Sequence, residues 1–129
     1  MSSNRSKGTR PEVALRKALW ASGLRGYRAN LRSVAGTPDV VFTKHRLAVF
    51  VHGCFWHACP NCGRFRYPKQ NAAYWRQKIE ANRVRDAETQ RVLIDAGYRT
   101  VVVWECEVKK DLAGCVERVR SALAEARES

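Results

Sequence analysis

The sequence predicts an α/β domain of three layers, in which helices flank a central mixed β-sheet. Three short runs are apolar and β-branched, as buried strands are: Asp39–Thr43, Leu47–Val51 and Thr100–Trp104. Helical segments stand before, between and after them. Because the elements follow one another in the order α, β, β, β, α, β, α, helices are expected on both faces of one sheet.

The first part of the chain predicts one helix and one short strand. Thr9-Arg10-Pro11-Glu12 matches a capping box with proline in the first turn, and apolar residues at helical spacing follow as far as Gly23. Tyr27–Leu31 is expected to form a short strand, and Gly36-Thr37-Pro38 then interrupts regular structure. The domain therefore begins with a helix that precedes the sheet.

The remaining elements begin with a hairpin. Asp39–Thr43 and Leu47–Val51 are joined by a polar loop, which predicts an antiparallel pair at the centre of the sheet. A long helix is expected over about 71–96 and a final helix over 111–126. Thr100–Trp104 lies between these helices and is expected to join the sheet as another buried strand.

Length and composition limit the domain organisation. The chain has 129 residues and a hydrophobic content of 45%, which fits one compact domain with a real core. We expect a flexible basic arm at residues 1–8 and a single folded domain at 9–129. No apolar stretch approaches the roughly 20 residues of a membrane span, and the basic start lacks the apolar region of a signal peptide. The expected compartment is the cytoplasm.

The charge of the chain points to a class of partner. The net charge is +12, from 24 Lys and Arg against 12 Asp and Glu. Such an excess on a small domain favours a polyanion, most often nucleic acid, although ribosomal proteins and basic enzymes share it. Aromatic residues interleaved with the positive charge strengthen the expectation of nucleic acid.

A carboxylate and an imidazole are expected to meet at the end of the hairpin. If the chain turns at His45-Arg46, Asp39 and His52 pair directly, with Cβ atoms about 5 Å apart on one face. Such a pair can hold a divalent ion or a metal-bound water. The structural alternative is that Asp39 ends a Thr-Pro-Asp turn and His52 only hydrogen-bonds to it. Glu12 is explained as the capping-box acid, or has a second role near the metal.

The cysteines have the spacing of a metal site. Four of the five cysteines of the chain fall on one loop and a neighbouring strand end: Cys54, Cys59, Cys62 and Cys106. Four thiolates that converge in this way form a closed tetrahedral site, which is structural rather than catalytic. Reduced cysteines in the cytoplasm favour such ligation over disulfides. The alternatives are a chance CxxC with two core cysteines, or His57 in place of one thiolate. Cys115 is expected in the core.

An aromatic pair stands between the two histidines of the same loop. Phe55 and Trp56 are adjacent, so both rings cannot point into one core from an extended segment. A rigid exposed ring suits insertion between DNA bases. The alternative is that both rings pack over the metal loop.

The long helix carries polar residues where apolar ones are expected. One arc of roughly 100° holds six residues of mostly polar character: Asn71, Trp75, Lys78, Asn82, Arg85 and Asp86. Polar groups on the inner side of a helix need partners or have a function. Several together favour a site, in which Asp86 could orient a neighbouring histidine as a base.

In their order along the chain, these motifs resemble those of the very-short-patch-repair endonucleases. Those are bacterial DNA mismatch nicking enzymes with a restriction-endonuclease-like fold. The resemblance runs from about Arg5 to Val108 and is long and ordered. Its specific parts are Thr9-x-Pro11-Glu12, Pro38-Asp39, Phe50–His57, the set Asn71, Tyr74, Trp75, Lys78, Ile79, Asn82, Arg85 and Asp86, and Val103–Cys106.

The resemblance implies a reaction and a metal ion. The reaction is a Mg²⁺-dependent nick in one strand, 5′ of the thymine in a T:G mismatch that arises when 5-methylcytosine is deaminated. Asp39 is then the Mg²⁺ ligand, helped by the Val51 carbonyl. His52 and Glu12 are implied to bind phosphate and metal-bound water.

The resemblance also implies a base and a DNA surface. His57 is similar to the family's general base, steered by Asp86. Phe55 and Trp56 look like the wedge beside the mispair, joined by a methionine of the arm. The residues implied to contact DNA are Met1, Phe55, Trp56, Asn71, Lys78, Asn82 and Arg85.

The expected cofactors are catalytic Mg²⁺ and structural Zn²⁺. The expected partner is double-stranded DNA with a T:G mismatch, bound by a monomer of the bacterial cytoplasm and nucleoid, with downstream repair proteins after the nick. Two alternatives stay open. The chain is a related metal-dependent restriction-like endonuclease with a different specificity, or a non-catalytic DNA-binding module held together by zinc. Asp39, His57 and Asp86 argue against the binding module, because it needs no oriented base.

Overall fold

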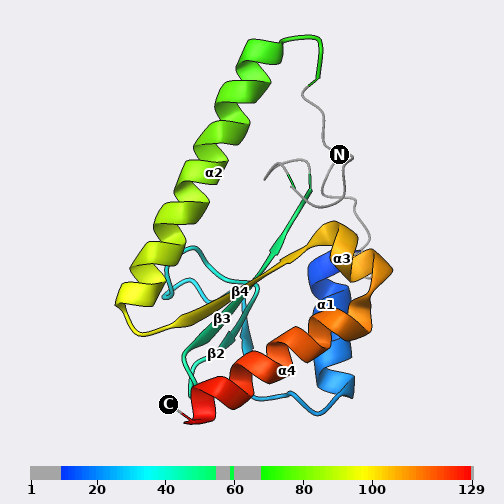
Figure 1. The fold of residues 1–129 in the computed structure, drawn as a ribbon, viewed down its shortest axis with the longest axis vertical. Coiled ribbons are helices and arrows are strands. Elements are labelled where there is room, and N and C mark those ends of the chain that lie inside the picture. Colours follow the sequence, from blue (N-terminus) through cyan, green and yellow to red (C-terminus); the bar gives the residue numbers. More distant parts are fainter. Residues whose placement is uncertain (1–9, 55–58, 60–67, 129) are drawn as a thin grey trace.

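The computed structural model describes residues 10–54, 59 and 68–128. These residues form one four-stranded mixed sheet and four helices, which confirms the predicted mixed α/β class. Figure 1 shows helices on both sides of the sheet. In chain order the elements are α1 (Pro11–Ala21), β1 (Arg28–Ala29), β2 (Val40–Phe42), β3 (Leu47–His52), α2 (Ala72–Asp95), β4 (Arg99–Trp104), α3 (Glu105–Lys110) and α4 (Leu112–Glu128).

The strands lie in the order β1-β2-β3-β4, so the predicted hairpin of β2 and β3 occupies the centre. β1 and β2 pair antiparallel, as do β2 and β3, whereas β3 and β4 are parallel. A parallel pair needs a long crossover connection, and α2 with its 24 residues lies within it. The crossover brings the C-terminal ends of β3 and β4 to the same end of the sheet.

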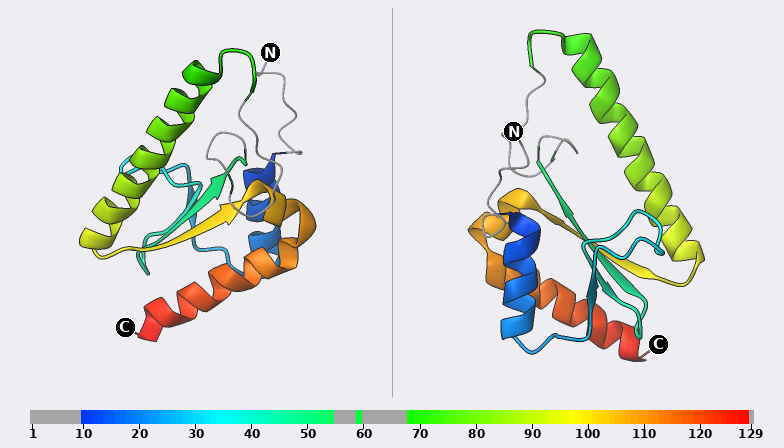
Figure 2. Two further views of the ribbon diagram at one scale, coloured as in Figure 1. Left: turned by 45° about the horizontal axis from the view of Figure 1, so that its top comes forward. Right: turned by 180° about the vertical axis from the view of Figure 1, so that it is seen from behind.

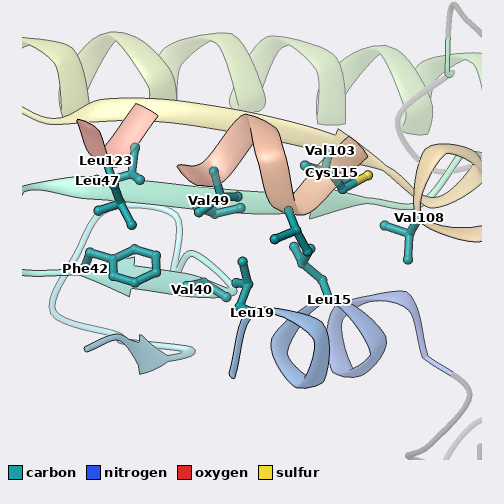
Figure 3. Close-up of a cluster of buried hydrophobic side chains, with 12 residues drawn as sticks. Leu15, Leu19, Val40, Phe42, Leu47, Val49, Val103, Val108, Cys115 and Leu123 are labelled. Atoms are coloured by element: carbon teal, nitrogen blue, oxygen red, sulfur yellow. The ribbon is translucent and has the colours of Figure 1, made fainter. Parts of the chain in front are cut away.

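The larger core lies between one face of the sheet and helices α1, α3 and α4 (Figure 3). Leu47 and Val49 point to this face from β3, and both are fully buried. Leu15 and Leu19 reach it from α1, four residues apart on one stripe of the helix. The core therefore fixes α1 against β2, which Asp39 precedes, and against β3, which His52 ends.

The opposite face of the sheet is covered by the segment after β1 and by the C-terminal part of α2. Ala48 and Phe50 alternate with the residues of the first face and pack with Leu93 of α2. Because both faces are covered, β3 is a continuous apolar run rather than an alternating one. Figures 1 and 2 show the N-terminal turns of α2 beyond the end of the sheet.

The register of the hairpin differs from the prediction. Val40 pairs with Val49 and Phe42 with Leu47, so the turn spans the four residues 43–46 instead of two. The His45 amide donates to the Phe42 carbonyl at 3.1 Å, which closes this longer turn. Asp39 and His52 are therefore not directly opposite. A shift of two residues keeps side chains on the same face, so the two still lie toward one side of the sheet.

Two helix ends also differ from the prediction. The residue that precedes α1 is Arg10, without a side-chain capping bond, so α1 begins one residue later than a cap at Thr9 predicts. Thr9 itself lies outside the described residues. Helix α3 was not predicted, and Cys106 lies in it rather than at a strand end. Its start is fixed because the Trp104 amide donates to Glu107 Oε1 at 2.9 Å.

Two further expectations concern the chain as a whole. The arm expected at residues 1–8 lies outside the described residues. Of the helices in residues 10–54 and 68–128, none is long and apolar enough to cross a membrane.

Candidate active site and thiol cluster

Asp39 sits immediately before β2, and a backbone amide of the next strand holds its side chain. Asp39 Oδ2 accepts a hydrogen bond from the Val51 amide at 2.7 Å. Burial raises the pKa of the Asp39 carboxyl, and the Val51 hydrogen bond opposes that rise. A partly buried carboxylate is attracted to a neighbouring cation more strongly than an exposed carboxylate is, because water screens the two charges less. Asp39 is therefore suited to bind a metal ion.

Asp39 lines a cavity of about 210 Å³ at the end of the sheet. The cavity brings three predicted catalytic residues together, because β3 contributes His52, α2 contributes Asp86, and the segment before β2 contributes Asp39. Its full lining is Gly36, Thr37, Asp39, Phe50, Val51, His52, Arg85, Asp86, Thr89 and Gln90. Two carboxylates, an imidazole and a guanidinium around one space can hold a phosphate and activate water.

His52 is the last residue of β3, and it is the buried polar residue of this end, with 8% of its surface exposed. Its ring meets the edge of Trp104, with centroids 5.2 Å apart, because the two residues are paired in the parallel strands β3 and β4. The Phe50 ring also lies beside it, with centroids 6.0 Å apart. Packed rings restrict the imidazole to a narrow set of orientations, as a catalytic group requires.

The wall of the cavity opposite β3 depends on a glycine. Gly36 has φ +79°, and a Cβ there would collide with the Thr89 methyl and lie 3.2 Å from the Phe50 ring. The missing side chain therefore lets α2 approach the segment before β2. Thr37 follows with φ 46°, an unfavourable backbone for a β-branched residue. Strain of this kind persists where surrounding packing fixes it, often beside a functional site.

Glu12 approaches Asp39 from the other side of the sheet. It lies in the first turn of α1, and Arg10 Nη1 is 3.7 Å from its Oε2. Its charge adds to the rise in the pKa of Asp39, behind the larger effect of burial. Glu12 does not line the cavity itself. The structure therefore brings Asp39, His52 and Asp86 to one cavity and leaves Glu12 outside its lining.

Three thiols form a second cluster at the same end of the sheet. The Sγ atoms of Cys54, Cys59 and Cys106 all lie within 4.8 Å of one another. Cys59 and Cys106 are 47 residues apart in sequence, and their sulfur atoms are 3.7 Å apart. Burial, together with the neighbouring thiols, raises the pKa of Cys54. A bound cation would reverse this effect, because it favours the thiolate form.

The backbone around the cluster is fixed by two hydrogen bonds. The Cys54 amide donates to Glu105 Oε1 at 3.2 Å, and the Cys59 amide donates to the Cys54 carbonyl at 2.9 Å. Both bonds hold thiol-bearing residues in place, as the hydrogen-bonded surroundings of metal ligands do. Cys115 is 2% exposed and belongs to the larger core, which confirms the prediction for it.

The two sites suit different metal ions. Soft thiolates in a tetrahedral set select zinc, and the cluster supplies three of the four ligands that such a site takes. Mg²⁺ prefers one or two carboxylates together with water and substrate phosphates. Asp39 is a carboxylate that suits such an ion, and the charge of Glu12 reaches it. Among the described residues, the thiol cluster is the one group of three convergent metal-ligating side chains.

Comparisons with known proteins identify the family. The model of the family described as DNA mismatch endonuclease Vsr matches residues 1–63. The type II nicking enzyme V.XorIIP of Xanthomonas oryzae is 46% identical over 92% of this chain and 85% of its own length. V.NmeDIP of Neisseria meningitidis, also a type II nicking enzyme, is 46% identical over 95% of this chain and 82% of its own. The chain belongs to the Vsr family. It is a strand-nicking DNA endonuclease, which hydrolyses phosphodiester bonds.

The Vsr family contains proteins with two kinds of description. The DNA mismatch endonuclease Vsr of Escherichia coli is 35% identical over 81% of this chain and 65% of its own length. That identity is lower than the 46% found with the two type II nicking enzymes. Family membership therefore confirms the resemblance seen in the sequence, and the comparisons favour a nicking enzyme with another specificity over the mismatch repair enzyme.

Only part of the polar arc of α2 lines the cavity. Asn82 is half-buried and accepts a hydrogen bond from Arg85 Nη1 at 3.3 Å, and Arg85 lines the cavity. Lys78 is exposed one turn away and does not line the cavity. Asn71 precedes the helix in a left-handed conformation, with φ 59°. Of this set, Arg85 and Asp86 line the cavity together with Asp39.

Several predicted residues lie outside the described part of the chain. They are the general base, the wedge, the methionine of the arm and one thiol: His57, Phe55, Trp56, Met1 and Cys62. Their roles stay predictions, as does the orientation of His57 by Asp86.

Sequence reasoning missed part of the cavity wall. Thr89 and Gln90 follow Asp86 by three and four residues on α2, so the spacing of a helix face could have found them. Glu105 was overlooked as the acceptor for the Cys54 amide, although it directly precedes Cys106. Nothing local in the sequence signals that Gly36 meets Thr89 and Phe50.

Proposed function

We propose that the protein is a Mg²⁺-dependent, restriction-like endonuclease of the Vsr family that nicks one strand of DNA with a specificity of its own. The observation that carries the proposal is the cavity at the end of the sheet, where Asp39, His52 and Asp86 meet beside Arg85. Hydrolysis of a phosphodiester needs an activated water and neutralisation of the charge that builds on the phosphate. The cavity offers groups for both tasks.

The proposed roles follow the chemistry of each group. Asp39 and the Val51 backbone would hold Mg²⁺, and bound Mg²⁺ would neutralise charge on the scissile phosphate. The Val51 amide on Asp39 supports this, because it fixes the carboxylate in one orientation. His52 and Glu12 would bind phosphate and the attacking water, and His57, steered by Asp86, would take the proton of that water. Cys54, Cys59, Cys106 and Cys62 would hold a structural Zn²⁺.

The nature of the preferred site has two candidate answers. Identities of 46% with type II nicking enzymes support a nick set by the surrounding DNA sequence. The family description and its match over residues 1–63 support a second candidate, a nick 5′ of the thymine in a T:G mismatch. In the second case Phe55, Trp56 and Met1 would form the wedge, since unstacking costs least at a mispair. Asn71, Lys78 and Asn82 would contact DNA in both cases.

A nicking assay on labelled duplexes tests the proposal. The substrates are a T:G duplex and its T:A counterpart, each in a panel of flanking sequences, with Mg²⁺ and with EDTA. Asp39→Ala and His57→Ala are the variants, and Cys115→Ala is the control because Cys115 lies in the core away from the cavity. We expect one nicked product that requires Mg²⁺ and disappears in both site variants.

The pattern across the panel separates the two candidates. Cleavage confined to particular flanking sequences, with T:G and T:A cut alike, supports sequence-specific nicking. Cleavage confined to T:G duplexes supports the mismatch activity. Salt-sensitive binding without any nick, in every duplex and with Mg²⁺ present, would overturn the proposal.

A further inference from the structure

Arg16 is a charged residue at the catalytic end of the molecule that no role above uses. It follows Glu12 by four residues on α1, so both side chains leave the same face of the helix. The helix is fixed at this point, because Leu15 and Leu19 are fully buried and the Tyr27 hydroxyl donates to the Arg16 carbonyl at 3.2 Å. The backbone of Arg16 is therefore fixed in position relative to the sheet.

The guanidinium of Arg16 carries a buried donor that lacks an acceptor. Its Nη1 atom is shielded from solvent, and no hydrogen-bond partner for it occurs in the part of the chain that the structure describes. An unsatisfied buried donor is costly, and more so when it is charged. Arg10 Nε is in the same condition, two residues before Glu12. Arginines with a shielded, unpaired nitrogen thus precede and follow Glu12 in the first turns of α1.

The charges around Arg16 indicate which kind of ligand would accept a hydrogen bond from its unpaired donor. Beyond the dominant effect of burial, the charge of Arg16 lowers the pKa of Asp39 and that of Glu12 raises it, so the three groups share one electrostatic neighbourhood. Figure 1 shows the first turns of α1 and the C-terminal end of β3 toward the same end of the molecule. An anion bound to a cation at Asp39 would therefore lie within reach of Arg16.

We propose that Arg16 binds a backbone phosphate of the strand that is nicked, through a rotation of its side chain that brings the shielded Nη1 to a phosphate oxygen. This rests on the proposed nuclease function and adds a substrate contact to it. A planar guanidinium offers two parallel donors to a phosphate, which lysine cannot do. The donor is left unsatisfied in the unbound protein and is satisfied when DNA binds.

The test combines three variants and three measurements. Arg16→Met keeps the length of the side chain and removes every donor, and Arg16→Lys keeps the charge and removes the planar fork. Lys17→Met is the matched control, because Lys17 is the next residue of the same helix and is exposed. For each variant we would measure melting temperature, the slope of log K against log salt for DNA in EDTA, and single-turnover nicking with Mg²⁺.

The expected results separate substrate binding from a structural role. Arg16→Met should leave the melting temperature unchanged or higher, because it replaces an unsatisfied buried donor by an apolar group. It should reduce the salt slope by about one and slow nicking about 100-fold. Arg16→Lys should keep the slope and slow nicking about 10-fold. Lys17→Met should match the wild type in all three.

Two outcomes would overturn the inference. The first is a salt slope for Arg16→Met equal to that of Lys17→Met. The second is a lower melting temperature for Arg16→Met that accounts for its loss of nicking. If the wild type nicks no duplex, the proposed function fails, whereas the slope in EDTA still decides whether Arg16 contacts phosphate.

Discussion

Replacing Gly36 by alanine tests whether α2 closes on the cavity wall as the structure shows. A Cβ at Gly36 would collide with Thr89 Cγ2 and lie 3.2 and 3.3 Å from two atoms of the Phe50 ring. Gly23 is a matched control. Its φ is +88°, against +79° at Gly36, and no described atom beyond its chain neighbours lies within 4 Å of a Cβ built there.

The magnitudes of the two substitutions differ by the steric term. Alanine in a left-handed conformation costs about 1 to 2 kcal/mol, which is the full expected loss for Gly23→Ala. Overpacking adds about 1 to 3 kcal/mol, so Gly36→Ala should lower the free energy of unfolding by about 2 to 5 kcal/mol. For a chain of this size each 1 kcal/mol corresponds to about 3 to 5 °C in melting temperature.

Urea unfolding followed by circular dichroism measures these differences, with nicking assayed on the same preparations. A third variant, Gly36→Ala with Thr89→Ser, removes the colliding methyl and should recover the steric part of the loss. Thr89→Ser alone corrects for its own effect. Equal costs at Gly36 and Gly23, or no recovery in the double variant, would refute the close approach of α2.

Three further predictions follow from single contacts. Burial raises the pKa of Asp39 above 3.8, so the wild type binds that proton more tightly when folded and loses stability as the pH rises through the raised pKa. Asp39→Asn cannot ionise, so its melting temperature should gain on that of the wild type as the pH rises from below 3.8 through the raised pKa. A constant difference across this rise would contradict the prediction. We expect about one zinc ion per chain by elemental analysis in the wild type and in Cys115→Ser, and none in Cys106→Ser, because Cys106 supplies one of the three convergent thiols. Zinc retained by Cys106→Ser would place the ion elsewhere. Arg118 donates to the Val102 carbonyl at 2.7 Å and to Glu107 Oε1 at 3.1 Å. Arg118→Ala should therefore lower the free energy of unfolding, measured in urea, by about 1 kcal/mol. Arg120→Ala loses one exposed ion pair and should lower it by less than about 0.5 kcal/mol. Similar losses in both variants would show that the Val102 contact contributes nothing.

The elements of the fold could be predicted because each has a local cause. The apolar run of β3 and the polar loop before it predict a central strand and a hairpin, and both occur. Glycine after the long helix predicts its end, and α2 does end at Asp95, with Gly97 at φ +90°. The short helix α3 was missed, since its start depends on one side-chain bond from Glu107 to the Trp104 amide. Propensity over six residues gives little signal against such a bond.

Part of the candidate site was also visible in the sequence. Asp39 and His52 were expected on one face, and they do line one cavity, although their direct pairing was wrong. The register failed because a turn of two residues and one of four place the same residues on the same face, so the apolar pattern cannot distinguish them. All three of the predicted thiols that the structure describes converge, and the fourth, Cys62, lies outside the described residues. The prediction was possible because cysteine spacing within a loop is local information.

By itself, the sequence determined the class of fold, the family of nucleases, and the residue types that a phosphodiester and a zinc ion require. Those depend on composition, periodicity and ordered motifs, which are properties of the chain as written. The tertiary structure alone decided which groups share a space. It placed Glu12 and Arg16 of α1 near Asp39, and Thr89 of α2 against Gly36. These contacts join elements far apart in sequence, and their geometry follows from how the two faces of the sheet are packed.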